Sequence, residues 1–204
     1  PGAGRDLAIA DLDQDGDQDF IVVLASDRRV EIVYNAGDGS VANVTSLDQG
    51  SVSNVSAEDL NGDGAADLLL ATDGDDMSAP QNRVLYQQGG GQFAPGQSFG
   101  ASPVTALISG DIDADGWTDI IAINDAGVHQ LYLGAQDGSF SLAPEQIVSA
   151  GMKRGVLTDF NSDESLDLIL VGSTAGVLEI HANNGIGRLG LGDRRNPDIE
   201  LLGE

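Results

Sequence analysis

The sequence predicts an all-β fold built from four copies of one unit, and two observations carry this prediction. One acidic loop occurs four times, beginning at Asp11, Asp59, Asp111 and Asp159, with successive starts 48, 52 and 48 residues apart. A fixed period of this size is typical of solenoids and propellers. Between the loops, short apolar runs are bounded by Gly, Asn and Asp, which indicates strands and not helices.

The first unit shows the expected order of strands. We expect strands over residues 7–10, 20–25 and 30–34 and from Val41 onward, with turns at Asp27-Arg28 and at 37–39. Four short strands per repeat of about 50 residues is the content of one propeller blade, with the acidic loop between its first two strands. The longest connection, residues 72–81 of the second unit, is expected to be a solvated acidic loop.

The whole chain is therefore expected to form a β-propeller of four visible four-stranded antiparallel blades. We treat residues 1–204 as a single propeller domain or as part of one. Its expected blades are approximately 1–48, 49–99, 100–149 and 150–192, followed by a tail or linker at 193–204. With 41% hydrophobic and only 4% aromatic residues, the core is expected to be aliphatic.

Each loop carries oxygen-bearing side chains at positions one, three, five and nine. The four sets are Asp11, Asp13, Asp15 and Asp19; Asp59, Asn61, Asp63 and Asp67; Asp111, Asp113, Asp115 and Asp119; and Asp159, Asn161, Asp163 and Asp167. Ca²⁺ takes six to eight oxygen ligands, and such a loop can turn its oxygens toward one point. The sequence therefore predicts up to four bound Ca²⁺ ions.

Position six of the loop requires a backbone with positive φ. Three loops have glycine there, which adopts this conformation freely, but the fourth has Glu164. We therefore expect loop four to bind calcium most weakly.

The charge of the chain excludes two classes of partner. Thirty-three acidic residues against nine basic ones give a net charge of −24, part of which lies in the four loops. Nucleic acids and anionic membrane surfaces attract Lys and Arg, so neither is an expected partner. No apolar run approaches the roughly 18 residues of a spanning helix, and no membrane insertion is expected.

Because the chain has no cysteine, bound calcium is expected to provide the cross-linking that disulfide bonds give to other extracellular proteins. Without cysteine there is no disulfide framework. Sites of millimolar affinity fill only where calcium is plentiful, which favours an extracellular, cell-surface or periplasmic location. The sequence starts at Pro1 without a charged and apolar leader, so we expect a soluble mature fragment.

An EF-hand does not explain these loops. That motif needs a bidentate Glu at position twelve on an exiting helix. Position twelve is instead apolar in every loop, where the chain already has a strand pattern: Val22, Leu70, Ala122 and Leu170.

The acidic loop, the strand after it, and a Tyr followed by a Gly-rich turn leading to Phe resemble the FG-GAP/VCBS repeats of integrin α-subunit propellers and bacterial surface proteins. The resemblance implies that Ca²⁺ also binds the backbone carbonyl at position seven, which here is Asp17, Ala65, Trp117 or Ser165. Such propellers usually have seven blades, and four are visible here. The alternatives are a closed four-bladed ring, pairing with a second copy, or further blades from a longer chain.

The leading functional hypothesis is a calcium-stabilised extracellular binding or adhesion module for a protein or glycan. The alternative is an extracellular enzyme or accessory domain that acts on polysaccharide, with His129 in a central cleft. No catalytic constellation is visible, so we expect no enzyme. His129, near Asp125, is expected to be an exposed edge residue, and His181 to fill the same structural position as Tyr132.

Overall fold

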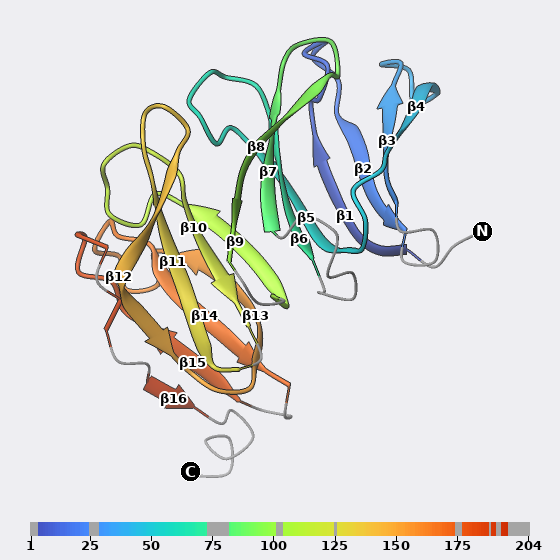
Figure 1. Ribbon diagram of the computed structural model, residues 1–204. Coiled ribbons are helices and arrows are strands. Elements are labelled where there is room, and N and C mark those ends of the chain that lie inside the picture. Colours follow the sequence, from blue (N-terminus) through green and yellow to red (C-terminus); the bar gives the residue numbers. More distant parts are fainter. Residues whose placement is uncertain are drawn as a thin grey trace. The chain divides into compact units, whose positions relative to one another are not determined.

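The computed structural model describes residues 4–24, 29–72, 82–100, 104–124, 126–173, 177–187, 189–190 and 193–195. The predicted turn at Asp27-Arg28, Asp125 and nearly all of the predicted acidic loop at 72–81 lie outside these ranges. Within them the structure contains no helix, and four antiparallel sheets of four strands each (Figure 1). This confirms the predicted all-β fold of propeller blades.

The strands of each sheet follow one another in chain order. Blade 1 consists of β1 (Gly4–Ala10), β2 (Asp19–Leu24), β3 (Arg29–Asn35) and β4 (Val41–Leu47). Blade 2 consists of β5 (Val52–Glu58), β6 (Asp67–Thr72), β7 (Asn82–Gln87) and β8 (Phe93–Phe99). Each acidic loop therefore connects the first two strands of its blade, as the sequence predicts.

Blades 3 and 4 repeat this arrangement. Blade 3 consists of β9 (Ala106–Gly110), β10 (Asp119–Ile123), β11 (Val128–Gly134) and β12 (Phe140–Val148). Blade 4 consists of β13 (Met152–Thr158), β14 (Asp167–Gly172), β15 (Leu178–His181) and β16 (Asp193–Arg195).

The short strand β16 differs from the expected organisation, because it lies in the segment that the sequence analysis assigns to a tail. Leu178 pairs with Arg195, and Ile180 with Asp193, in an antiparallel ladder. The segment Asp193–Arg195 consists of charged residues and has no apolar alternation. This segment is a strand because its backbone pairs with β15. Its amino-acid sequence alone does not predict a strand.

The chain divides into two compact units. Unit 1 comprises residues 1–107 together with Gln136–Ser139, and so contains blades 1 and 2. Unit 2 comprises Ile108–Ala135 and Phe140–Glu204, which hold nearly all of blade 3 and all of blade 4.

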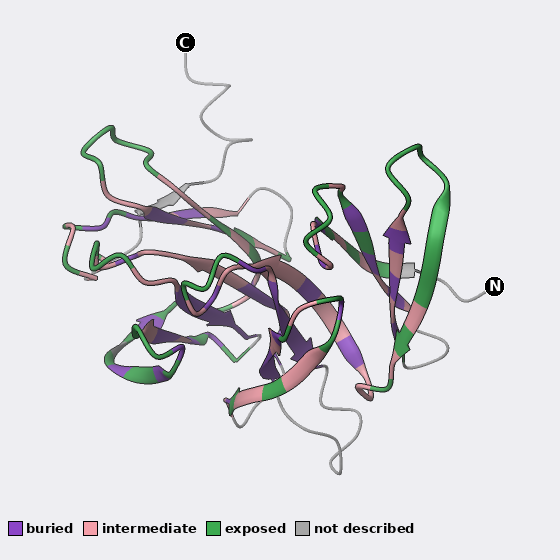
Figure 2. Ribbon diagram, turned by 90° about the horizontal axis from the view of Figure 1, so that it is seen from above, coloured by how far each residue is buried: buried purple, intermediate pink, exposed green. Residues whose placement is uncertain are grey.

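The core of unit 1 is aliphatic and lies between its two blades. One face of β2 and β3, with Ile21 and Ile32, is buried in the same cluster as Val55 and Leu68 of blade 2. Burial alternates along β2, whereas all six residues of β6 are buried. Figure 2 colours the ribbon by burial and shows strands with both buried and exposed residues. The continuous apolar run in β6 thus marks a strand covered on both faces.

Within unit 2, the first strand of blade 4 approaches blade 3 closely. A Cβ at Gly155 in β13 would come within 2.8 Å of Ile123 and 3.2 Å of Ile108. A Cβ there would have to displace the ends of these isoleucine side chains, so the sheets of blades 3 and 4 pack closely at β13. Among the described residues, no helix is long and apolar enough to cross a membrane.

Candidate metal centres

The backbone of the four acidic loops confirms the expected turn at position six. Gly16, Gly64 and Gly116 have φ of 94°, 83° and 92°, and Glu164 adopts 69° at the same place. The repeat therefore imposes the left-handed conformation even where the residue is not glycine. Holding a non-glycine residue there costs on the order of 1 kcal/mol or more.

Position four is a second left-handed residue, which sequence reasoning missed. Gln14, Ala114 and Ser162 have φ of 66°, 59° and 63°, and Gly62 in loop two has 77°. Because three of the four residues are not glycine, the sequence gives no signal for this strain. Two left-handed residues so close together curl each loop tightly around the side chains at positions one, three and five.

The position-one aspartates hold the curled backbone. Their two carboxylate oxygens accept hydrogen bonds of 2.7 to 3.1 Å from backbone N–H groups at positions four to six. In loop one, for example, Asp11 accepts from Gln14 and Gly16. Aspartates that bond to nearby backbone in this way form Asx turns, which explains why the local sequence folds into this loop without help from distant residues.

The residues at positions five and seven are coupled in the same manner. The N–H of Asp17, Ala65, Trp117 or Ser165 donates to the position-five carboxylate at 2.8 to 2.9 Å. This bond fixes the peptide that carries position seven, whose carbonyl is the predicted backbone ligand.

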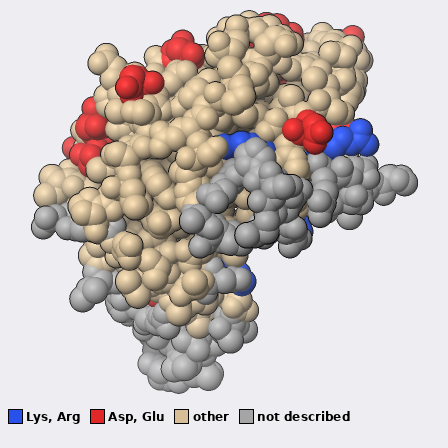
Figure 3. Space-filling model, in the orientation of Figure 1, with Lys and Arg blue, Asp and Glu red and all other residues tan. Residues whose placement is uncertain are grey.

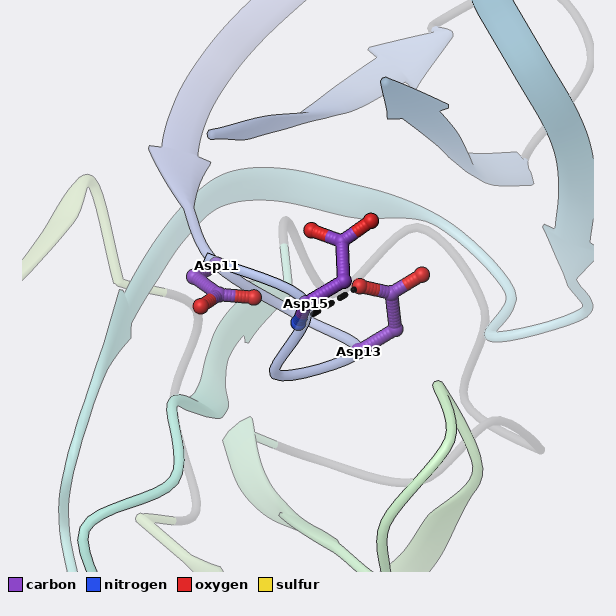
Figure 4. A group of neighbouring side chains, drawn as sticks. All are labelled: Asp11, Asp13 and Asp15. Carbon is purple, nitrogen blue, oxygen red and sulfur yellow. Dashed lines mark hydrogen bonds between the residues drawn. The ribbon is translucent and has the colours of Figure 1, made fainter. Parts of the chain in front are cut away.

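Loops one and three each bring three carboxylates together. Ligand oxygens of Asp11, Asp13 and Asp15 lie within 4.8 Å of one another, as do those of Asp111, Asp113 and Asp115. Figure 4 shows the first group, in which the backbone N–H of Asp15 donates to Asp13 at 3.3 Å. Like charges this close repel one another. The pKa values of Asp13 and Asp113 are raised, mainly by burial and to a smaller extent by the neighbouring carboxylates.

These groups fit a hard divalent cation. Their donors are all oxygens, as Ca²⁺ prefers, and Asp113 Oδ1 is buried without a hydrogen-bond partner. Positions one, three and five would hold the ion, together with the position-seven carbonyl, and the ion would supply positive charge that offsets the carboxylate repulsion.

In loops two and four, asparagine at position three replaces the middle carboxylate. The amide nitrogens of Asn61 and Asn161 donate to Asp63 and Asp163 at 3.1 and 2.9 Å. The Asn161 amide is the main cause that lowers the pKa of Asp163. Each amide thus relieves locally the repulsion that loops one and three leave in place, so loops two and four gain less from binding a cation.

The position-nine aspartates have a structural role that sequence reasoning missed. Asp19, Asp67, Asp119 and Asp167 are fully buried. One oxygen of each accepts from the position-two N–H, and the other from the N–H at the end of the third strand or just after it. These eight distances are 2.8 to 3.1 Å. The position-nine aspartates are not part of either carboxylate triplet. Their hydrogen bonds hold the loop to its blade, and their role as calcium ligands stays a prediction.

Burial raises the pKa of Asp67 and of Asp119 to about 6. Both carboxyls bind protons more tightly in the folded than in the unfolded chain, so their contribution to stability is full below about pH 3.8 and is lost as the pH rises through about 6. We expect that, without calcium, changing the pH from 7 to 5 stabilises the wild type more than an Asp67→Asn, Asp119→Asn double variant, because asparagine does not titrate.

Melting curves in a chelator at the two pH values test this prediction. Burial lowers the pKa of His129, which makes acid destabilising at that residue. His129 is present in both proteins, so the comparison isolates the two carboxyls. An identical response to pH in both proteins would show that these carboxyls do not titrate in this range.

Loop four offers a test of the strain at position six. Glu164→Gly is expected to tighten calcium binding at the fourth site several-fold, because glycine removes a strain on the order of 1 kcal/mol or more. Calorimetry measures the affinity, with Gly116→Glu in loop three as the matched reverse change, expected to weaken its site. Equal or weaker binding by Glu164→Gly would mean that the charge of Glu164 decides the affinity.

The two histidines lie inside unit 2. His129, expected to be exposed at an edge, is fully buried: its Nδ1 accepts from the backbone of Asn124 at 3.3 Å, so the expectation of an exposed residue was wrong. Strand β11 packs this ring inward, a matter of sheet packing that a single polar residue does not reveal. His181 and Tyr132 pair with Leu168 and Ile120, the first residues after position nine, which confirms their shared structural position.

Solved structures with a similar fold include two β-propeller proteins. The first is a chain of the crystal structure of BBS1N in complex with ARL6DN, soaked with lead, with a TM-score of 0.61 and 14% identity over 96% of this chain and 55% of that chain. The second is the periplasmic gluconolactonase PpgL of Pseudomonas aeruginosa, with a TM-score of 0.56 and 18% identity over 93% of this chain and 56% of that one. At these identities the likeness concerns the fold alone, and this chain spans little more than half of either protein.

A search of curated protein sequences finds no match. The sequence model of the FG-GAP-like repeat, in contrast, matches residues 11–70 and 59–120, which together cover more than half of the chain. Both matched segments begin at position one of an acidic loop, and together they run from loop one to the start of β10 in blade 3. The repeated loops, the four-stranded blades and this match agree, and the chain belongs to the FG-GAP-like repeat family.

Proposed function

We propose that this chain is a calcium-stabilised binding or adhesion module. The observation that carries the proposal is the convergence of three carboxylates in each of loops one and three, with Asp113 Oδ1 buried and unpaired. A bound Ca²⁺ would offset the repulsion within each triplet and fix the loop between the first two strands of its blade. Loops two and four would bind calcium more weakly, because each has one carboxylate fewer at position three.

The proposed location is extracellular, at the cell surface or in the periplasm. FG-GAP repeats usually occur in extracellular or periplasmic proteins. Calcium there is abundant enough to fill sites of modest affinity. The strongly acidic composition suits a protein that meets neither nucleic acid nor an anionic membrane, and Figure 3 shows several separate acidic groups on the face in view.

The proposed partner is a protein or a glycan, held by loops at the strand ends opposite the metal loops. Residues 25–28, 73–81, 125 and 174–176, which follow the second strands in the sequence, lie outside the described part of the chain. We assign no catalytic role to the histidines. His181 Nδ1 bonds to the Gly190 carbonyl at 2.8 Å, and its buried Nε2, which makes no hydrogen bond, lies 3.1 Å from Glu179.

Binding arrays of glycans and extracellular matrix proteins, probed with and without calcium, test this proposal. We expect at least one class of ligand to be retained in calcium and lost in chelator, and retention to weaken in an Asp113→Ala variant. Asp137→Ala, which changes an exposed turn outside the metal loops, is the matched control and should bind as the wild type does. Turnover of a polysaccharide on the same arrays would favour the enzyme hypothesis instead.

A further inference from the structure

Two buried residues occupy the same place in blades 2 and 3 and make the same hydrogen bond. In both blades, the third residue after position nine pairs with the residue that directly follows Asn82 or His129. The N–H of the fifth residue after position nine then donates to the side chain, Thr72 to Asn82 Oδ1 at 2.9 Å and Asn124 to His129 Nδ1 at 3.3 Å. Both side chains are fully buried. Of these two residue types, only histidine titrates near neutral pH.

The hydrogen bond from Asn124 fixes the protonation state of His129. A ring nitrogen that accepts a hydrogen bond carries no proton, so the neutral ring has its proton on Nε2. Protonation of the ring would place an N–H at Nδ1, directly against the N–H of Asn124. Nε2 is itself buried without a hydrogen-bond partner among the described residues. The folded structure therefore accommodates the neutral ring of His129 and not the charged one.

Glu179 and His181, both on β15, are the charged groups that act on this ring. His181 Nδ1 lies 2.8 Å from the carbonyl of Gly190, which can only accept, so this nitrogen carries a proton. Its Nε2 lies 3.1 Å from Glu179 Oε1, and both side chains are buried. Two lone pairs would repel at this distance, so one further proton on the pair is needed to make the contact favourable. A charged His129 would therefore share one carboxylate with His181.

This environment opposes the charged form of His129. Burial lowers the pKa of His129 and the charge of His181 lowers it further, whereas the Ser149 backbone and Glu179 raise it to a smaller extent. In an open or unfolded chain the ring has its ordinary pKa of about 6.5. The stability contributed by the neutral ring is therefore full above about pH 6.5 and is lost as the pH falls through the lowered value. Acid favours a state in which water reaches His129.

Ser149 connects this cluster to both blades of unit 2. Its N–H donates to the carbonyl of Gly127, just before β11 of blade 3, at 2.9 Å. Its hydroxyl donates to the carboxylate of Glu179, on β15 of blade 4, at 2.5 Å. The packing is close, because a Cβ at Gly127 would come within 2.7 Å of the Cα of Ala150. Since the ring of His129 has no exposed surface, water reaches it only when the packing around this cluster opens.

We propose that His129 makes the junction between blades 3 and 4 sensitive to acid: protonation of its ring opens the contacts that Ser149, Glu179 and His181 form there. Blade 2 lacks this response at the same position, because Asn82 makes the same hydrogen bond and does not titrate. The proposal goes beyond the binding function and does not depend on it.

Native-state hydrogen exchange at pH 7.5 and pH 5, with calcium present throughout, tests the proposal. The protection of the Asn124 N–H, corrected for the intrinsic exchange rate, reports the opening around His129. Between the two pH values, the opening constant is expected to rise about tenfold more in the wild type than in a His129→Asn variant. An ordinary pKa of about 6.5 in the open state limits this difference to about thirtyfold. Asparagine keeps the hydrogen bond, as Asn82 does in blade 2, but takes up no proton.

The N–H of Thr72, which bonds to Asn82, is the internal control. Its protection should respond to pH alike in the wild type and in His129→Asn, because the substitution leaves blade 2 unchanged. If His129 had only a structural role, its replacement would lower the protection of the Asn124 N–H equally at both pH values. The difference in pH response therefore separates titration from a general loss of stability.

NMR of the imidazole nitrogens gives a second measurement, which is simple because the chain has two histidines. At pH 7.5, His129 is expected to be neutral with its proton on Nε2. Its titration is expected to coincide in pH with the loss of protection at the Asn124 N–H. If circular dichroism shows that His129→Asn does not fold, this coincidence in the wild type decides.

Three results would overturn the proposal. The first is an equal pH response of the Asn124 N–H in the two proteins. The second is a His129 ring that is charged, or protonated at Nδ1, at pH 7.5. The third is a titration of His129 that leaves the protection of the Asn124 N–H unchanged. Both proteins have the same metal loops and the same calcium concentration, so failure of the proposed binding function leaves this readout unchanged and is distinguishable from failure of this inference.

Discussion

Chelation of calcium is expected to lower the melting temperature of this protein by roughly 10 to 20 °C. Binding to the folded state alone stabilises by about 1.4 kcal/mol per site when calcium is tenfold above its dissociation constant, or about 5 to 6 kcal/mol for four sites. For a chain of this size, each 1 kcal/mol corresponds to about 2–4 °C. The physical source is the repulsion within the carboxylate groups, which bound calcium would offset in loops one and three above all.

Differential scanning calorimetry in calcium and in excess EGTA measures this effect. An Asp113→Ala variant should respond less to calcium than the wild type, because loop three then lacks one carboxylate of its triplet. Asp137→Ala, whose carboxylate bonds to Ser139 in an exposed turn, should respond as the wild type does. If EGTA left the melting curve unchanged, the prediction that calcium stabilises the fold would be wrong.

The Asp119→Ala substitution is expected to destabilise the protein by about 3 to 4 kcal/mol even in EGTA. Its two oxygens accept from Ile112 and Gly134 at 2.8 Å each, and Asp119 itself has no exposed surface. Alanine leaves the buried Ile112 N–H and the half-buried Gly134 N–H without this partner, at a cost of about 1–3 kcal/mol each. The loss comes from the protein's own hydrogen bonds, and so it does not require the metal.

Denaturant unfolding in EGTA separates the two roles of this residue. Asp115→Ala in the same loop removes an exposed carboxylate that supports only local bonds, and should cost far less in EGTA than Asp119→Ala does. In calcium, Asp115→Ala should cost more stability than it does in EGTA, because Asp115 is a predicted ligand. Equal losses in EGTA would mean that Asp119 acts only through the ion and does not hold the loop to its blade.

The repeated loop, its turn and the strands that flank it can be predicted from the amino-acid sequence alone. These features depend on near neighbours: Asx bonds span two to five residues, and strand periodicity is read within five or six. Even the left-handed conformation of Glu164 follows from its place in the repeat, because the bonds of Asp159 to the backbone around it enforce the turn.

The hydrogen bonds and packing between strands and between blades depend on the tertiary structure and could not be predicted from the sequence. The second bond of each position-nine aspartate, the amide of Gln87 on the Leu12 carbonyl and the burial of His129 all join residues brought together by sheet pairing and blade packing. Phe160 and Leu12 occupy the same position of the repeat, yet one is exposed and the other buried. Both side chains are apolar, and Leu12 is buried because it lies in the cluster shared with blade 2, a neighbour that no local sequence pattern encodes.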